Sequence, residues 1–122
     1  CVVELSCQGT ATDNCFSREN LPQFKRIYKV KMNDDNVGKL VNKVGYIDLL
    51  NIKDPNNIAR KPLSNGKFVF PFFTIENVDS VDDETIIVGN DNNLPFSSSR
   101  IPNQADDNEF ILLHVPEFLK AQ

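Results

Sequence analysis

The sequence lacks both a long apolar stretch and an excess of basic residues. No run of apolar residues approaches the ~20 that are needed to cross a bilayer, so a transmembrane span is not expected. The 122 residues include 13 Lys and Arg against 17 Asp and Glu, for a net charge of −4. Nucleic-acid binding depends on clustered Lys and Arg that neutralise phosphates. The composition therefore argues against a nucleic-acid partner as well.

Histidine and cysteine are scarce, which limits the sites that the chain can build. The cysteines are Cys1, Cys7 and Cys15, all within the first fifteen residues, and their spacing matches no zinc pattern. A local disulfide such as Cys7–Cys15 would indicate an oxidising compartment, with the protein secreted or periplasmic. Three reduced cysteines fit equally well. The single histidine, His114, has no second His or obvious nucleophile with it, which favours a buried or half-exposed strand residue over a catalytic base.

What the sequence does contain is a series of short strand patterns separated by turn residues. Helical periodicity is absent, except that residues 116–122 could form one turn. The patterns predict an all-β chain, an antiparallel meander. The chain begins at Cys1 and not Met, and residues 2–5 read as a strand entered part-way, so we expect a piece of a longer protein. The expected strands are residues 24–32, 44–50, 74–81, 84–89 and 109–115.

Two of these segments allow a prediction about side-chain placement. In residues 24–32 the alternation puts Phe24, Tyr28, Val30 and Met32 on one face, and Lys25, Lys29 and Lys31 on the opposite, solvent-exposed face. The aromatic cluster at residues 68–73 is expected in the core. The polar stretch at residues 51–67 reads as a long loop, and its Asn65-Gly66 pair has the chemistry of a turn with positive φ.

The densest group of polar side chains follows the apolar residues 85–88. Asn90, Asp91 and Asn92 offer several hard oxygen donors, which are the ligands that Ca²⁺ prefers. Antiparallel pairing across the Asp82-Asp83 turn would bring Glu76 to the same end of the sheet. The alternative is that Asn and Asp after a strand form a turn by bonding to their own backbone.

The loop that precedes the last strand contains the only arginine of the C-terminal half. Arg100 could contact an anionic substrate or pair with Asp106 or Asp107, and structural pairing is the usual role of such an arginine. The serines at residues 97–99 lack the G-x-S-x-G context of a nucleophile. Residues 106–109 could form a further oxygen cluster, although such runs more often end a solvated loop.

Three motifs in the second half of the chain carry a family resemblance: Ile75-Glu76-Asn77-Val78, Val88-Gly89-Asn90-Asp91-Asn92-Asn93 and Asp106 to Leu112. With them, the sequence resembles the C-terminal end of the phytase-like family, labelled "esterase-like activity of phytase". The resemblance covers residues 21–116 and has its most specific part at residues 75–112. It implies a β-propeller, of which this chain would supply one to two blades, with residues 21–122 as the C-terminal portion. Residues 1–20 lie outside the resemblance and are expected to be either the end of an upstream blade or a Cys-containing segment.

The resemblance implies two competing functions. In the first, the chain is a segment of a calcium-dependent hydrolase acting on a small phosphate or carboxylic ester, with Glu76, Asn90, Asp91 and Asn92 as Ca²⁺ ligands and Glu76 and Arg100 in catalysis. In the second, it is a non-catalytic propeller segment with a structural calcium site, which binds a protein or carbohydrate partner. Either way, the expected partners include the remaining blades, from another chain or a missing segment.

Overall fold

The computed structural model describes residues 2–6, 24–61, 63, 65–95, 97–101 and 103–122. The predictions for Cys1, Cys7 and Cys15 fall outside these residues. Along the described chain the elements are β1 (Val2–Ser6), β2 (Phe24–Lys31), the 3₁₀ helix η1 (Asp34–Asn36), β3 (Asn42–Asp48), β4 (Ile52–Lys53), β5 (Lys67–Phe68), β6 (Thr74–Ser80), β7 (Thr85–Asp91), β8 (Phe110–His114) and α1 (Pro116–Lys120).

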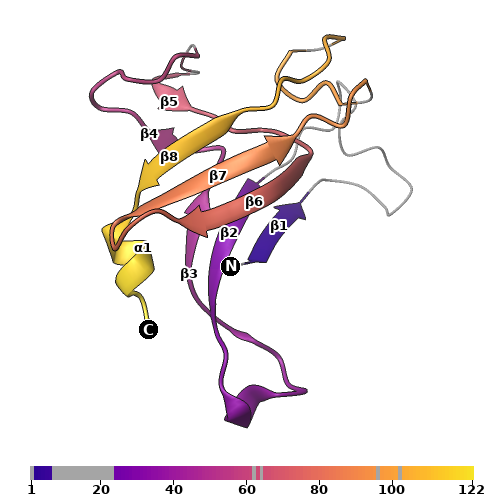
Figure 1. Cartoon of the computed structure of the whole chain (residues 1–122). Helices are drawn as coiled ribbons and strands as arrows, with labels where there is room; N and C mark the ends of the chain where they lie inside the picture. The colour runs from indigo at the N-terminus through magenta and orange to yellow at the C-terminus, as the bar shows by residue number, and fades with distance from the viewer. Residues whose placement is uncertain (1, 7–23, 62, 64, 96, 102) are drawn as a thin grey trace.

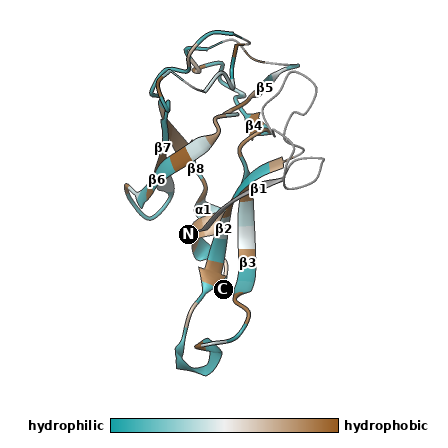
Figure 2. Ribbon diagram, turned by 90° about the vertical axis from the view of Figure 1, so that its right-hand side faces the viewer, coloured by the Kyte–Doolittle hydropathy of each residue, from teal (hydrophilic) through white to brown (hydrophobic). Residues whose placement is uncertain are grey.

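The strands form antiparallel sheets, which confirms the all-β prediction. Sheet A has the strand order β1-β2-β3, sheet C has the order β6-β7-β8, and β4 pairs with β5 in a small ribbon. Sheet C lies in front of sheet A in Figure 1, and the view from the side in Figure 2 shows the two as separate layers. Within the described residues, no helix is long and apolar enough to cross a membrane.

Apolar side chains from both three-stranded sheets meet in one core. Ile27 of β2 and Leu49 after β3 come from sheet A, and Ile86, Val88 and Leu113 come from sheet C. Each of these side chains is buried, so the two sheets bury each other's inner faces. Burial of this apolar surface is the main favourable contribution to folding.

An aromatic segment lies in this core and is bound to sheet A through its backbone. Phe68, Phe70 and Phe72 are buried, as predicted, and the rings of Phe70 and Phe72 meet edge to face with centroids 4.8 Å apart. The N–H of Phe70 donates to the carbonyl of Leu49 at 2.7 Å. Phe73, by contrast, is about half exposed, so only part of the predicted cluster belongs to the core.

The first long strand is confirmed, with Tyr28 buried and Lys31 exposed as predicted, but the predicted exposure is wrong at Lys25, Lys29 and Met32. Lys25 is only 1% exposed, whereas Met32 lies in solvent after the end of β2. The Nζ of Lys25 donates to the carbonyl of Phe73 at 2.8 Å, and the Nζ of Lys29 donates to the carbonyl of Leu119 in α1. Both lysines therefore turn inward, because backbone carbonyls there accept hydrogen bonds from the ammonium groups while their apolar stems are buried.

The remaining strand and turn predictions agree with the structure in most places. Asn65 and Gly66 have φ values of 51° and 74°, as expected for that turn. The stretch at residues 51–67 is not entirely loop, because β4 pairs with β5 across it. The last turn of the chain is the short helix α1, whose Phe118 packs over Gly45 of β3. His114 lies on β8 and is exposed, which agrees with the prediction of a half-exposed strand residue.

Truncation of the aromatic segment should destabilise the whole fold. We expect Phe70→Ala to lower the free energy of unfolding by about 3–5 kcal/mol, because Phe70 is fully buried between the sheets. Met32→Ala, at an exposed position, should change it by less than about 0.5 kcal/mol. Urea unfolding followed by circular dichroism measures both; equal effects would show that the segment is not the centre of the core.

The buried lysine should make stability depend on pH in the alkaline range. Burial lowers the pKa of Lys25 from 10.5 to about 8. Between these values the unfolded chain binds more protons than the folded chain, so stability should rise as the pH increases from about 8 to 10.5.

Substitution isolates this contribution from the other groups that titrate there. In Lys25→Met the rise in unfolding free energy across this range should shrink, whereas Lys31→Met, at an exposed position of the same strand, should leave it unchanged. Urea unfolding at both ends of the range provides the comparison. An undiminished rise in Lys25→Met would contradict the assignment.

Candidate functional site

The end of β7 is where the sequence predicted a calcium site, and strand register brings its backbone positions together. Ile75 of β6 pairs with Asn90, and Thr74 pairs with Asp91. A register shift between Ile75 and Asn77 marks a β-bulge at Glu76, which is exposed. The predicted proximity of Glu76 to this end of β7 therefore agrees with the sheet register.

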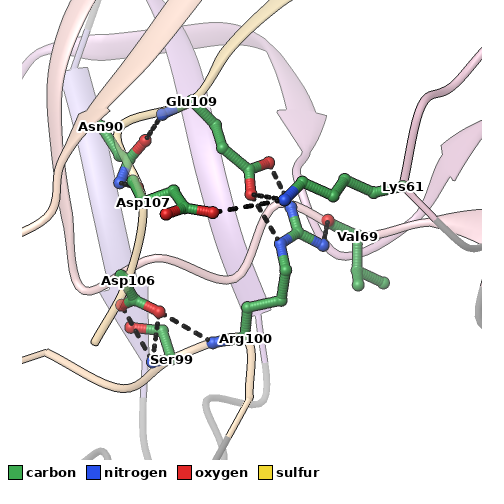
Figure 3. A network of polar contacts seen from close by, with 8 residues as sticks. All are labelled: Lys61, Val69, Asn90, Ser99, Arg100, Asp106, Asp107 and Glu109. Atoms are coloured by element: carbon green, nitrogen blue, oxygen red, sulfur yellow. Dashed lines mark hydrogen bonds and ion pairs between the residues drawn. The ribbon is translucent and has the colours of Figure 1, made fainter. Parts of the chain in front are cut away.

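Both polar atoms of the Asn90 side chain form hydrogen bonds within the protein. Asn90 is buried, its Nδ2 donates to the carbonyl of Asp107 at 3.0 Å, and its Oδ1 accepts from the N–H of Glu109 at 2.7 Å. Figure 3 shows this amide directed at the chain that enters β8. The oxygen that would ligate calcium holds two segments together instead, so Asn90 does not fit the role of a metal ligand in this arrangement.

The next residues along the chain bond to their own backbone, which is the alternative that the sequence left open. Asp91 Oδ1 accepts from the N–H of Asn93 at 3.2 Å, and Asn92 Oδ1 accepts from the N–H of Leu94 at 3.3 Å. Asn93 itself has a φ of 47°, in the left-handed region that Asn tolerates. These contacts are typical of turn formation after a strand.

The arginine of the following loop is held by a carboxylate that the sequence analysis did not pair with it. Arg100 Nε donates to Glu109 Oε1 at 3.0 Å, and its Nη2 donates to Glu109 Oε2 at 2.7 Å. Its Nη1 donates to the carbonyl of Val69 at 3.2 Å (Figure 3). The guanidinium also lies over the rings of Phe68 and Phe72, at 5.5 and 5.1 Å from their centroids. Its partner is thus Glu109, and not Asp106 or Asp107.

Asp106 organises the loop from the other side. It is buried, and its carboxylate accepts hydrogen bonds from the N–H groups of Ser99, at 2.9 Å, and Arg100, at 3.1 Å. The hydroxyl of Ser99 accepts from the N–H of Phe73 at 3.1 Å, so this serine is also part of the framework. We refer to the residues of Figure 3 as the polar clasp: Lys61, Val69, Asn90, Ser99, Arg100, Asp106, Asp107 and Glu109.

The space beside the clasp is small. A depression of about 30 Å³ is lined by Lys61, Phe72, Arg100 and Glu109, among others, which is room for about one water molecule. Lys61 approaches Asp107 at 3.4 Å and Glu109 at 3.6 Å. Throughout the described ranges, no group of three or more His, Cys, Asp and Glu side chains lies close enough together to hold a metal ion.

Glu109 and Lys61 are the members of the clasp whose role the sequence did not reveal. In the sequence, Glu109 is the last residue of the acidic run at 106–109, and Lys61 is one residue of the predicted loop at 51–67. Their contacts join segments that are distant in sequence, and the sequence has no pattern that indicates such contacts.

Comparison with known proteins identifies no family, because no family model, curated protein or solved structure matches the chain.

The ion pair of the clasp should be important for stability. We expect Glu109→Gln to lower the free energy of unfolding by about 3 kcal/mol, because the partly buried guanidinium of Arg100 loses its bidentate partner. The matched control is Asp107→Asn, since Asp107 is largely exposed and its contact with Lys61 is long; the expected loss there is below about 1 kcal/mol. Chemical denaturation of both variants measures the difference. Similar losses would mean that the clasp does not depend on this pair.

Proposed function

We propose that the chain is a non-catalytic segment of a larger antiparallel β-protein of the propeller type, which acts by binding other β-structure. The observation that carries this proposal is the bidentate contact of Arg100 with Glu109. A guanidinium that is already neutralised and covered by aromatic rings offers little to a substrate anion. The arginine that a hydrolase would use for binding is therefore part of the framework.

The arrangement of the sheets supports the same proposal. Propeller blades are typically four-stranded antiparallel sheets packed in succession. Sheets A and C are each three-stranded and antiparallel, and they pack through one shared core. An additional strand on each sheet would complete a pair of blades, which agrees with the family resemblance of residues 21–116.

The second candidate function is a calcium-dependent ester hydrolase, and one feature favours it. Glu76 lies at a β-bulge and is exposed near Asp91, and bulges are frequent beside active sites because they redirect a side chain. The two carboxylates would supply oxygen ligands for Ca²⁺, which would polarise the ester. Asn90 would have no part in this site, because its amide is engaged elsewhere.

Calcium calorimetry with the full chain distinguishes these functions. The variant Glu76→Gln/Asp91→Asn removes both exposed carboxylates. Its matched control, Glu84→Gln/Asp83→Asn, makes the same charge change at the opposite end of the same hairpin. The proposal predicts no hydrolysis of a phosphate monoester or a carboxylic ester by any of these proteins, with or without added Ca²⁺.

The calorimetric result then defines the role of any metal. Micromolar binding that is lost only in Glu76→Gln/Asp91→Asn, without hydrolysis, would add a structural calcium site to the proposed non-catalytic segment. The same loss together with calcium-dependent ester hydrolysis would overturn the proposal in favour of the second candidate.

A further inference from the structure

The sequence contains a single Asn-Gly pair, Asn65-Gly66, which precedes β5 and takes no part in the polar clasp. Both residues are exposed, with φ values of 51° and 74°. An asparagine side chain carries an amide that the backbone nitrogen of the next residue can attack. Glycine leaves that nitrogen open to such a reaction, because it has no Cβ atom beside it.

The hydrogen bonding of the next N–H group distinguishes Asn65 from other asparagines of similar conformation. Among the described residues, four asparagines have a positive φ, and at three of them the N–H group of the following residue forms a hydrogen bond. These bonds run from Ile58 to Asp54 Oδ1 at 3.0 Å, from Leu94 to Asn92 Oδ1 at 3.3 Å, and from Gln104 to the carbonyl of Ile101 at 3.2 Å. The fourth asparagine is Asn65, and the N–H of Gly66 has no acceptor among the described residues. The backbone nitrogen is thus held in place at three positions and unrestrained at Gly66.

The surroundings of the pair leave room for the chain to rearrange. A Cβ atom at position 66 would have no contact within 4 Å apart from its chain neighbours. The adjoining ribbon consists of two residue pairs, Ile52 with Phe68 and Lys53 with Lys67. The second pair puts two lysines directly opposite each other, and like charges in that position weaken strand pairing. Local opening of so small a ribbon needs little free energy.

We propose that Asn65 is a site of spontaneous deamidation in the folded protein. The backbone nitrogen of Gly66 loses its proton to hydroxide and attacks the side-chain carbonyl carbon of Asn65. A C–N bond forms, and the side-chain nitrogen takes a proton from water and leaves as ammonia, so that a cyclic succinimide remains. Water opens this ring at the side-chain carbonyl to give aspartate, or at the main-chain carbonyl to give isoaspartate. The net reaction consumes water and releases ammonia. It is independent of the binding function proposed above.

The two products differ in their effect on the ribbon. Aspartate changes only the side chain, and aspartate tolerates the left-handed conformation that Asn65 adopts. Isoaspartate passes the main chain through the side-chain carbon, which adds a backbone carbon immediately before β5. Phe68 of β5 is buried and lies against the guanidinium of Arg100. Isoaspartate at position 65 therefore displaces a strand that belongs to the core, whereas aspartate leaves it in place.

Peptide mass spectrometry after incubation of the folded, full chain at mildly alkaline pH tests the proposal. Conversion at Asn65 should be faster than at Asn57 and Asn103 by about tenfold or more in the same sample. These two are matched internal controls, because both are exposed asparagines with positive φ. Aspartate and isoaspartate should both appear, since the succinimide opens at either carbonyl. Hydroxylamine, which cleaves a chain at a succinimide, should cut between residues 65 and 66.

Two variants separate the role of the glycine from that of the exposed turn. Gly66→Ala should slow conversion at Asn65 by about tenfold or more, because the added Cβ atom shields the nitrogen. Asn65→Asp marks the position of the aspartate product in the chromatogram and should unfold in urea at the same midpoint as the unmodified chain. The isoaspartate fraction of an incubated sample should unfold at a lower urea concentration than either.

Three results would overturn the proposal. One is conversion at Asn65 no faster than at Asn57 and Asn103, and another is conversion to aspartate alone, which direct hydrolysis of the amide would give. The third is a reaction that proceeds in the urea-unfolded chain but not in the folded one. None of these results bears on ester hydrolysis or calcium binding, so the proposed non-catalytic function is tested separately.

Discussion

The shared burial of two apolar sheet faces is the constraint on which the rest of this structure depends. A three-stranded sheet needs something against its apolar face to be stable, and here each sheet covers the other. The aromatic segment fills the space between them, and its backbone is bound to sheet A by the contact between Phe70 and Leu49. Because sheet A comes from the first half of the chain and sheet C from the second, this core forms only when distant parts of the sequence meet.

The polar clasp follows from the same core. The chain that leads into β8 passes over the edge of the aromatic segment, where Arg100 lies over Phe68 and Phe72. A charge in such a place needs a close partner, because its hydration is partly lost. Glu109 is that partner, and Asn90 and Asp106 satisfy the backbone groups on either side. The most polar part of the chain is thus a structural element.

Much of the fold could be predicted from the sequence, because alternation and turn residues act over a few positions. The strands, the Asn65-Gly66 turn and the turn-forming role of Asp91 all follow from such local rules. The inward orientation of Lys25 could not be predicted, since it depends on the carbonyl of Phe73, far along the chain. The pairing of Arg100 with Glu109 has the same character, because the loop between them has to fold before the two side chains can meet.

The close contact of Gly89 with Phe110 limits how this protein can vary. A side chain at position 89 would occupy the volume that the ring now fills. A larger residue at 89 would therefore require either that the Phe110 ring, which is 64% exposed, turn aside or that position 110 become smaller. Glycine at 89 thus lets an aromatic ring at 110 lie flat against the neighbouring strand.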